Sequence, residues 1–119
     1  MSQIENRPAT SAAKVQLYVT TSPLLKAMQE ELREFAKKKP EATLSKSKVS
    51  LINRLFSDVK ELLKDEDTSK YLDPLDEETL PQYSDVVLIG SQYLAALDAF
   101  HDRYFTRVPG SHGSGWAIK

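Results

Sequence analysis

The chain of 119 residues contains no cysteine. This absence excludes a disulfide scaffold, a thiol nucleophile and any zinc or iron–sulfur site held by cysteine thiolates. Glycine is almost as scarce: three of its four residues stand at positions 110, 113 and 115. The remaining glycine, Gly90, is solitary, so the sequence has no glycine-rich phosphate-binding loop.

Long apolar segments are also missing. The longest unbroken apolar runs, at 86–89 and 93–97, have four and five residues, whereas a membrane-spanning helix needs about 20 apolar residues. The first ten residues contain no apolar core next to basic residues, so they do not resemble a secretory signal. We therefore expect a cytoplasmic protein without membrane contact.

The composition predicts one folded domain. Leu, Ile, Val and Phe make up 30 of the 119 residues and the net charge is −1, whereas disordered chains combine few of these residues with high net charge. The length allows one thin core and leaves little room for two. We expect a flexible N-terminus over 1–11, a single helical domain over 12–108 and a Gly/Ser-rich tail over 109–119.

Proline positions and apolar spacing predict three main helices, over 23–38, 46–64 and 84–105. Ser22-Pro23 is typical of a helix start and Pro40 of a helix end. The second helix carries the clearest amphipathic pattern, with a repeat of about 3.6 residues. Between the second and third helices, Asp73-Pro74 followed by Glu77-Glu78 predicts a single helical turn. The apolar positions of the first two helices are Leu24, Leu25, Met28, Leu32, Phe35, Leu51, Ile52, Leu55, Phe56, Val59, Leu62 and Leu63.

The segment 12–21 has two interpretations. Val15, Leu17 and Val19 alternate with polar residues, which is typical of a half-buried strand. A lone strand would have to pair with a second copy of the chain, whereas a short helix would pack on the bundle; we favour the helix. The sequence as a whole predicts a small all-α, up-down helical bundle of three main helices with a possible fourth at the N-terminus.

The third predicted helix is apolar on almost every face. Two amphipathic neighbours do not easily cover such a helix, so we expect a homodimer, or a stable complex with another protein, that buries the surplus. Gly90 within it marks a close approach by another backbone or weakens the helix by about 1 kcal/mol relative to alanine. We assign partner binding to four aromatic residues, although core packing is the simpler interpretation for the first three: Tyr93, Phe100, Tyr104 and Trp116.

Charge is separated along the chain. Between Arg33 and Arg54, seven bases stand against two acids, a local net charge of +5. Between Asp58 and Asp85, ten acids stand against three bases, a local net charge of −7. Because clustered bases bind phosphates, an alternative function is that of a nucleic-acid accessory protein using Lys37, Lys38, Lys39, Lys46 and Lys48.

The two histidines do not predict an enzyme. His101 shares a helix face with Asp98, and a metal ion would need at least one more ligand from elsewhere. Neither His101 nor His112 has a recognisable nucleophile beside it. We therefore expect no catalytic residues, no metal and no cofactor. The favoured function is a non-catalytic, self-associating protein–protein interaction or regulatory module.

Overall fold

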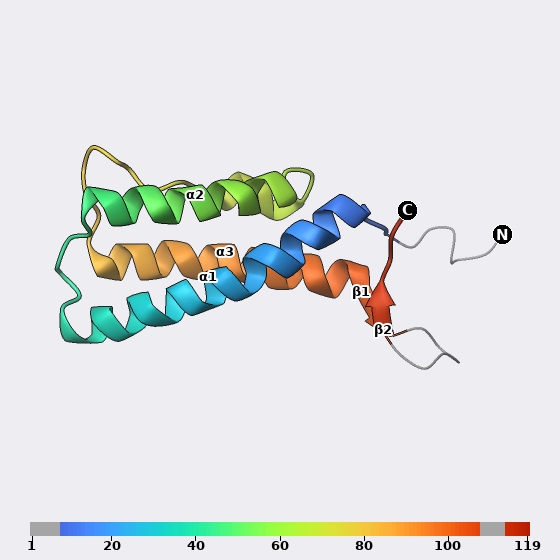
Figure 1. Ribbon diagram of the computed structural model, residues 1–119, viewed down its shortest axis with the longest axis horizontal. Coiled ribbons are helices and arrows are strands. Elements are labelled where there is room, and N and C mark those ends of the chain that lie inside the picture. Colours follow the sequence, from blue (N-terminus) through green and yellow to red (C-terminus); the bar gives the residue numbers. More distant parts are fainter. Residues whose placement is uncertain (1–7, 108–113) are drawn as a thin grey trace.

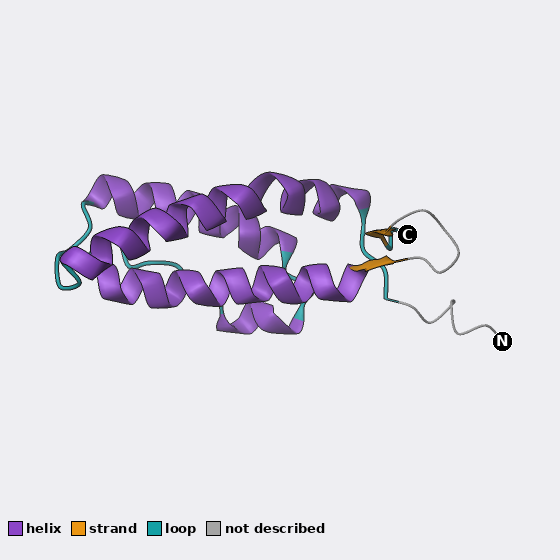
Figure 2. Ribbon diagram, turned by 90° about the horizontal axis from the view of Figure 1, so that it is seen from below, coloured by secondary structure: helices purple, strands orange, loops and turns teal. Residues whose placement is uncertain are grey.

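The computed structural model describes residues 8–107 and 114–119 and shows three long helices packed into a bundle (Figures 1 and 2). Helix α1 spans Ala12–Lys38, α2 spans Lys46–Leu62 and α3 spans Tyr83–Tyr104. A short 3₁₀ helix, η2, spans Asp67–Tyr71, and the strands β1, Phe105–Arg107, and β2, Ser114–Trp116, pair antiparallel at one end. The predicted small all-α bundle is confirmed.

The helix directions differ from a simple up-down order, because α3 runs in the same direction as α2 (Figure 1). The connection between them returns along the bundle, so both helices begin beside the loop that follows α1. Two backbone hydrogen bonds fix this end: Leu44 N donates to Pro81 O at 2.9 Å, and Tyr83 N donates to Ala42 O at 2.9 Å. A connection of this length permits a parallel neighbour, which a short turn does not.

The returning connection is held by a side chain of α2. The Asn53 Nδ2 donates to the Leu75 carbonyl and its Oδ1 accepts from the Leu75 N–H, both at 2.8 Å. The predicted helical turn at 73–78 is wrong, since η2 lies earlier and Asp76 instead accepts from the N–H of Glu78 at 2.8 Å. This N–H bond lowers the pKa of the Asp76 carboxyl. Because the N–H and C=O groups of Leu75 bond to Asn53 of α2, they are not available for a local helical turn.

Helix α1 is one continuous helix through Pro23. It begins where the Ser11 hydroxyl accepts from Lys14 N at 3.2 Å, so the prediction that a separate helix starts at Ser22-Pro23 is wrong. Pro23 supplies no N–H to the carbonyl one turn earlier, at Val19, an exposed residue whose carbonyl can be satisfied by water. The favoured helical interpretation of 12–21 is confirmed.

The core lies where all three helices meet. Phe56 of α2 and Tyr93 of α3 stack with ring centroids 3.8 Å apart and an interplanar angle of 9°. The Tyr93 hydroxyl donates to Asp73 O at 2.8 Å, and burial raises the pKa of this hydroxyl far above its usual range. The apolar residues of the core include Leu25, Leu32, Val49, Ile52, Val59, Leu62, Val86, Leu97 and Phe100.

The protein's own chain covers most of α3. Val86, Tyr93, Ala96, Leu97 and Phe100 are buried, and among the apolar residues of 86–89 only Leu88 is largely exposed, at 64 %. The expectation that this helix leaves a large uncovered face is therefore wrong. The reason is that α1 has 27 residues rather than the predicted 16, and that the connection and the C-terminal residues pack against the bundle as well.

Gly90 lets α1 approach α3 closely. Gln29 of α1 is buried, and its Nε2 donates to the Val87 carbonyl at 2.7 Å. A Cβ on Gly90 would lie 2.1 Å from the Gln29 Oε1, which is shorter than any ordinary contact. Any larger residue here would therefore force the Gln29 side chain to move.

We expect Gly90→Ala to change the free energy of unfolding in opposite directions depending on Gln29. In the wild-type background it destabilises, because the Gln29 amide is displaced and its hydrogen bond is lost. In a Gln29→Ala background it stabilises by about 1 kcal/mol, the gain in helix propensity. Denaturant unfolding of the four proteins measures the coupling, expected at about 1–3 kcal/mol. Additive effects would show that the two residues do not constrain each other.

Candidate protein interface

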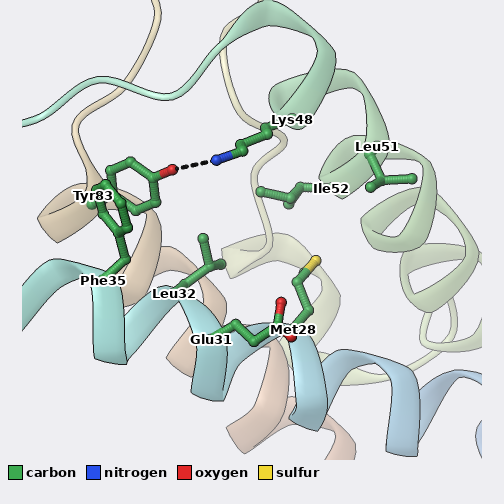
Figure 3. A pocket seen from close by; sticks show the side chains of 8 residues that line it. All are labelled: Met28, Glu31, Leu32, Phe35, Lys48, Leu51, Ile52 and Tyr83. Carbon is green, nitrogen blue, oxygen red and sulfur yellow. Dashed lines mark hydrogen bonds between the residues drawn. The ribbon is translucent and has the colours of Figure 1, made fainter.

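A groove runs between α1 and α2 and is closed at one end by Tyr83 of α3. One hollow of this groove has a volume of about 270 Å³ and is shown in Figure 3. The floor consists of apolar side chains from both helices, and Glu31, Lys48 and Tyr83 stand at the edges. The lining residues are Met28, Glu31, Leu32, Phe35, Lys48, Leu51, Ile52 and Tyr83.

Aromatic rings and an ammonium group close one end of this groove. Phe35 of α1 and Tyr83 of α3 have ring centroids 4.2 Å apart. The Lys48 Nζ donates to the Tyr83 hydroxyl at 3.0 Å (Figure 3) and lies 5.8 Å from the centre of the Phe35 ring. A positive charge at the N-terminal end of α2 is unfavourable to the helix dipole, and these contacts with the aromatic rings offset that effect.

A second hollow continues the groove along the same face. It is lined by Leu24, Ala27, Met28, Glu31, Leu51, Arg54, Leu55 and Asp58, and three of these residues, Met28, Glu31 and Leu51, also line the first hollow. Large apolar side chains are exposed along the two hollows: the exposed fraction is 56 % for Leu24, 58 % for Leu51 and 41 % for Phe35. A continuous apolar surface of this kind is typical of a docking site. We call it the α1–α2 face.

The two helices give this face charges of opposite sign. Glu30, Glu31, Glu34 and Lys38 lie on α1 beside Phe35, whereas Lys48, Arg54 and Asp58 lie on α2. Among the described residues, Glu31, Lys48 and Arg54 form no ion pair within the chain. The face thus carries mainly negative charge along α1, where Glu34 pairs with Lys37, and mainly positive charge along α2.

The predicted partner-binding residues lie elsewhere. Tyr93, Phe100 and Tyr104 are buried in the core, at 0 %, 1 % and 6 % exposure, and present no surface in this conformation. Trp116 of β2 is half-buried and packs back on its own chain, 5.0 Å from the Tyr18 ring and 5.2 Å from the Phe105 ring. Their role in partner binding stays a prediction.

His101 belongs to the same aromatic group as Trp116. Its ring stacks on Phe105 at 4.6 Å and meets Trp116 edge-on at 5.5 Å. Its only polar contact among the described residues is with the adjacent Asp102 at 3.5 Å. The described part of the chain contains no group of three or more metal-ligating side chains, and His112 lies outside it.

The predicted basic residues meet at one end of the bundle. Lys37 and Lys38 end α1, Lys39 follows, and Lys46 and Lys48 begin α2. All five are exposed. Two are engaged within the chain: Lys37 pairs with Glu34 at 3.0 Å, and Lys48 bonds to Tyr83.

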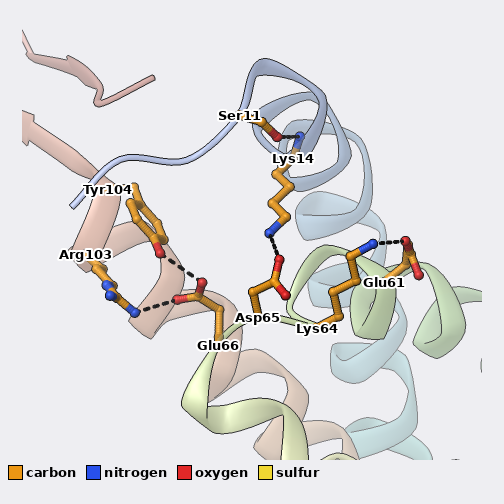
Figure 4. A network of polar contacts seen from close by, with 8 residues as sticks. All are labelled: Ser11, Lys14, Glu61, Lys64, Asp65, Glu66, Arg103 and Tyr104. Atoms are coloured by element: carbon orange, nitrogen blue, oxygen red, sulfur yellow. Dashed lines mark hydrogen bonds and ion pairs between the residues drawn. The ribbon is translucent and has the colours of Figure 1, made fainter. Parts of the chain in front are cut away.

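Three of the ten acids of segment 58–85 form ion pairs near the other end of the bundle (Figure 4). Lys14 pairs with Asp65 at 2.7 Å, which lowers the pKa of the Asp65 carboxyl. Glu66 accepts from Arg103 at 3.3 Å and from the Tyr104 hydroxyl at 2.9 Å. Burial and this bond to Glu66 raise the pKa of the Tyr104 hydroxyl. These acids join the ends of α1, α2 and α3, so they serve the fold.

Comparison with protein families, curated proteins and solved structures finds no match to this chain. From residue 8 to 107 and from 114 to 119, no helix is long and apolar enough to cross a membrane. Function is therefore inferred from the α1–α2 face itself.

We expect Asp65→Asn to reduce stability at neutral pH and to have less effect in acid. Because the folded-state pKa of Asp65 is lowered, its contribution to the free energy of unfolding is complete above its unfolded-state pKa, near 3.8. This contribution is lost as the pH falls through the folded-state pKa. Urea unfolding of both proteins at pH 7 and in steps below pH 4 measures the difference. A difference that stays constant down to the lowest pH would contradict this assignment.

Proposed function

We propose that this protein is a non-catalytic protein–protein interaction module that docks a partner on the α1–α2 face. The observation that carries the proposal is the exposure of Leu24, Phe35 and Leu51 along one hollowed surface. Burying such side chains contributes about 25 cal/mol per Å² of apolar area removed from water. Burial of these side chains by a partner stabilises the complex, whereas in the isolated chain they stay in contact with water.

The charges beside the apolar strip give such docking its specificity. Charged groups around an apolar centre guide the approach of a complementary partner and disfavour others. A regulatory role and a cytoplasmic setting, both expected from the sequence, stay predictions within this proposal.

The nucleic-acid alternative has less support. The five lysines share one end of the molecule, but acids lie among them: Glu34 pairs with Lys37, and Asp85 lies in the first turn of α3, beside the same loop. An acidic neighbour weakens phosphate binding. We therefore favour a protein partner.

The α1–α2 face is tested by photo-crosslinking. We expect benzoylphenylalanine in place of Leu51 to give a specific crosslinked adduct in cells of the native host. The matched control places the same group at Leu88, which is 64 % exposed on α3 but lies off the face. Introducing Leu24→Glu into the Leu51-labelled chain should remove most of the adduct, since it adds a charge to the docking surface; as a surface change it should alter stability by only about 0.5 kcal/mol.

Circular dichroism of the Leu24→Glu protein verifies that the bundle is intact. Equal adducts from positions 51 and 88, or an adduct that Leu24→Glu does not change, would show that the α1–α2 face is not the docking surface.

A further inference from the structure

The partner that best fits the α1–α2 face is a second copy of this chain. We propose that two copies associate through this face about a twofold axis parallel to the helices, so that α1 of each copy lies over α2 of the other. This inference rests on the proposed docking function and names its occupant.

The first argument is charge complementarity. In a twofold interface, a patch on one copy meets the same patch on the other, so each residue contact occurs twice. An axis parallel to the helices places the acidic α1 edge against the basic α2 edge. An axis across the helices would place α1 on α1 and bring Glu30, Glu31 and Glu34 near their own copies, which like charges disfavour.

The second argument is the level of the residues along the groove. Met28, Glu31 and Leu51 line both hollows, so Leu51 lies level with the turn of α1 from Met28 to Glu31. Rotation about an axis along the groove keeps this height. That turn of one copy then lies over Leu51 of the other, which brings Glu31 near Lys48 and Arg54, one turn to either side of Leu51.

The third argument is that this arrangement supplies opposite charges to groups that the single chain leaves without an ion pair. Glu31, Lys48 and Arg54 have no ion pair among the described residues, and the first turn of α2 contains no acid to balance Lys46 and Lys48. A carboxylate from the second copy supplies the charge that favours this end of the helix. The net charge of −1 leaves little long-range repulsion between copies.

The experiment measures association of the full chain by sedimentation equilibrium. We expect a concentration-dependent dimer, weakened about tenfold or more by Glu31→Lys and by Arg54→Glu, because each change brings like charges together. An equimolar mixture of the two variants should associate more tightly than either alone, because one of the two contacts in the mixed dimer is the wild-type contact. Asp98→Lys, an exposed acid changed on α3, is the matched control and should leave the dimer unchanged.

Each other outcome contradicts the proposal. A monomer up to about 100 µM overturns the second copy as occupant, while the crosslinking at Leu51 still decides whether the face docks another protein. A dimer that Glu31→Lys and Arg54→Glu do not weaken uses another surface. Weakening without recovery in the mixture excludes the proposed pairing of α1 with α2. Unchanged helical content by circular dichroism separates these results from misfolding.

Discussion

The close packing of α1 on α3 at Gly90 determines the arrangement of the whole bundle. Gln29 reaches the backbone of α3 there, with its Nε2 2.7 Å from the Val87 carbonyl, and the absence of a side chain at Gly90 leaves space for its amide. Helix α1 buries residues between Thr21 and Leu32. Together with the returning connection and the C-terminal residues, α1 covers most of α3.

The uncovered apolar surface is therefore found on different helices from the one expected. A helix that is apolar all round is not evidence for a partner once a 27-residue neighbour, a returning connection and a docked C-terminal strand lie against it. Amphipathic helices provide the surplus instead, because α1 and α2 pack with Leu24, Phe35 and Leu51 outside the contact. Association through the α1–α2 face would complete the burial that the single chain leaves unfinished.

Local signals predicted what depends on neighbours in the sequence. Ser45 accepts from Lys48 N and begins α2 where the pattern placed it, while Pro23 indicated a helix start that packing overrides. The contact of Gln29 with Val87 joins residues 58 positions apart, and a single glutamine on a polar stretch carries no sign of it. Apolar spacing indicated the face to which Leu51 and Phe35 belong, but not how much of that face a neighbouring helix covers. The groove could not be predicted for this reason.

The central claim is that two copies of the chain meet through the α1–α2 face, and a distance between copies tests it most directly. The chain contains no cysteine, so Leu51→Cys and, separately, Leu88→Cys each provide a single site for a spin label. Helices in contact lie about 8–10 Å apart, so pulsed electron spin resonance should give a short distance between copies, of about 10–20 Å, from position 51 and a longer one from position 88. No dipolar signal from position 51, or the shorter distance from position 88, would contradict the account.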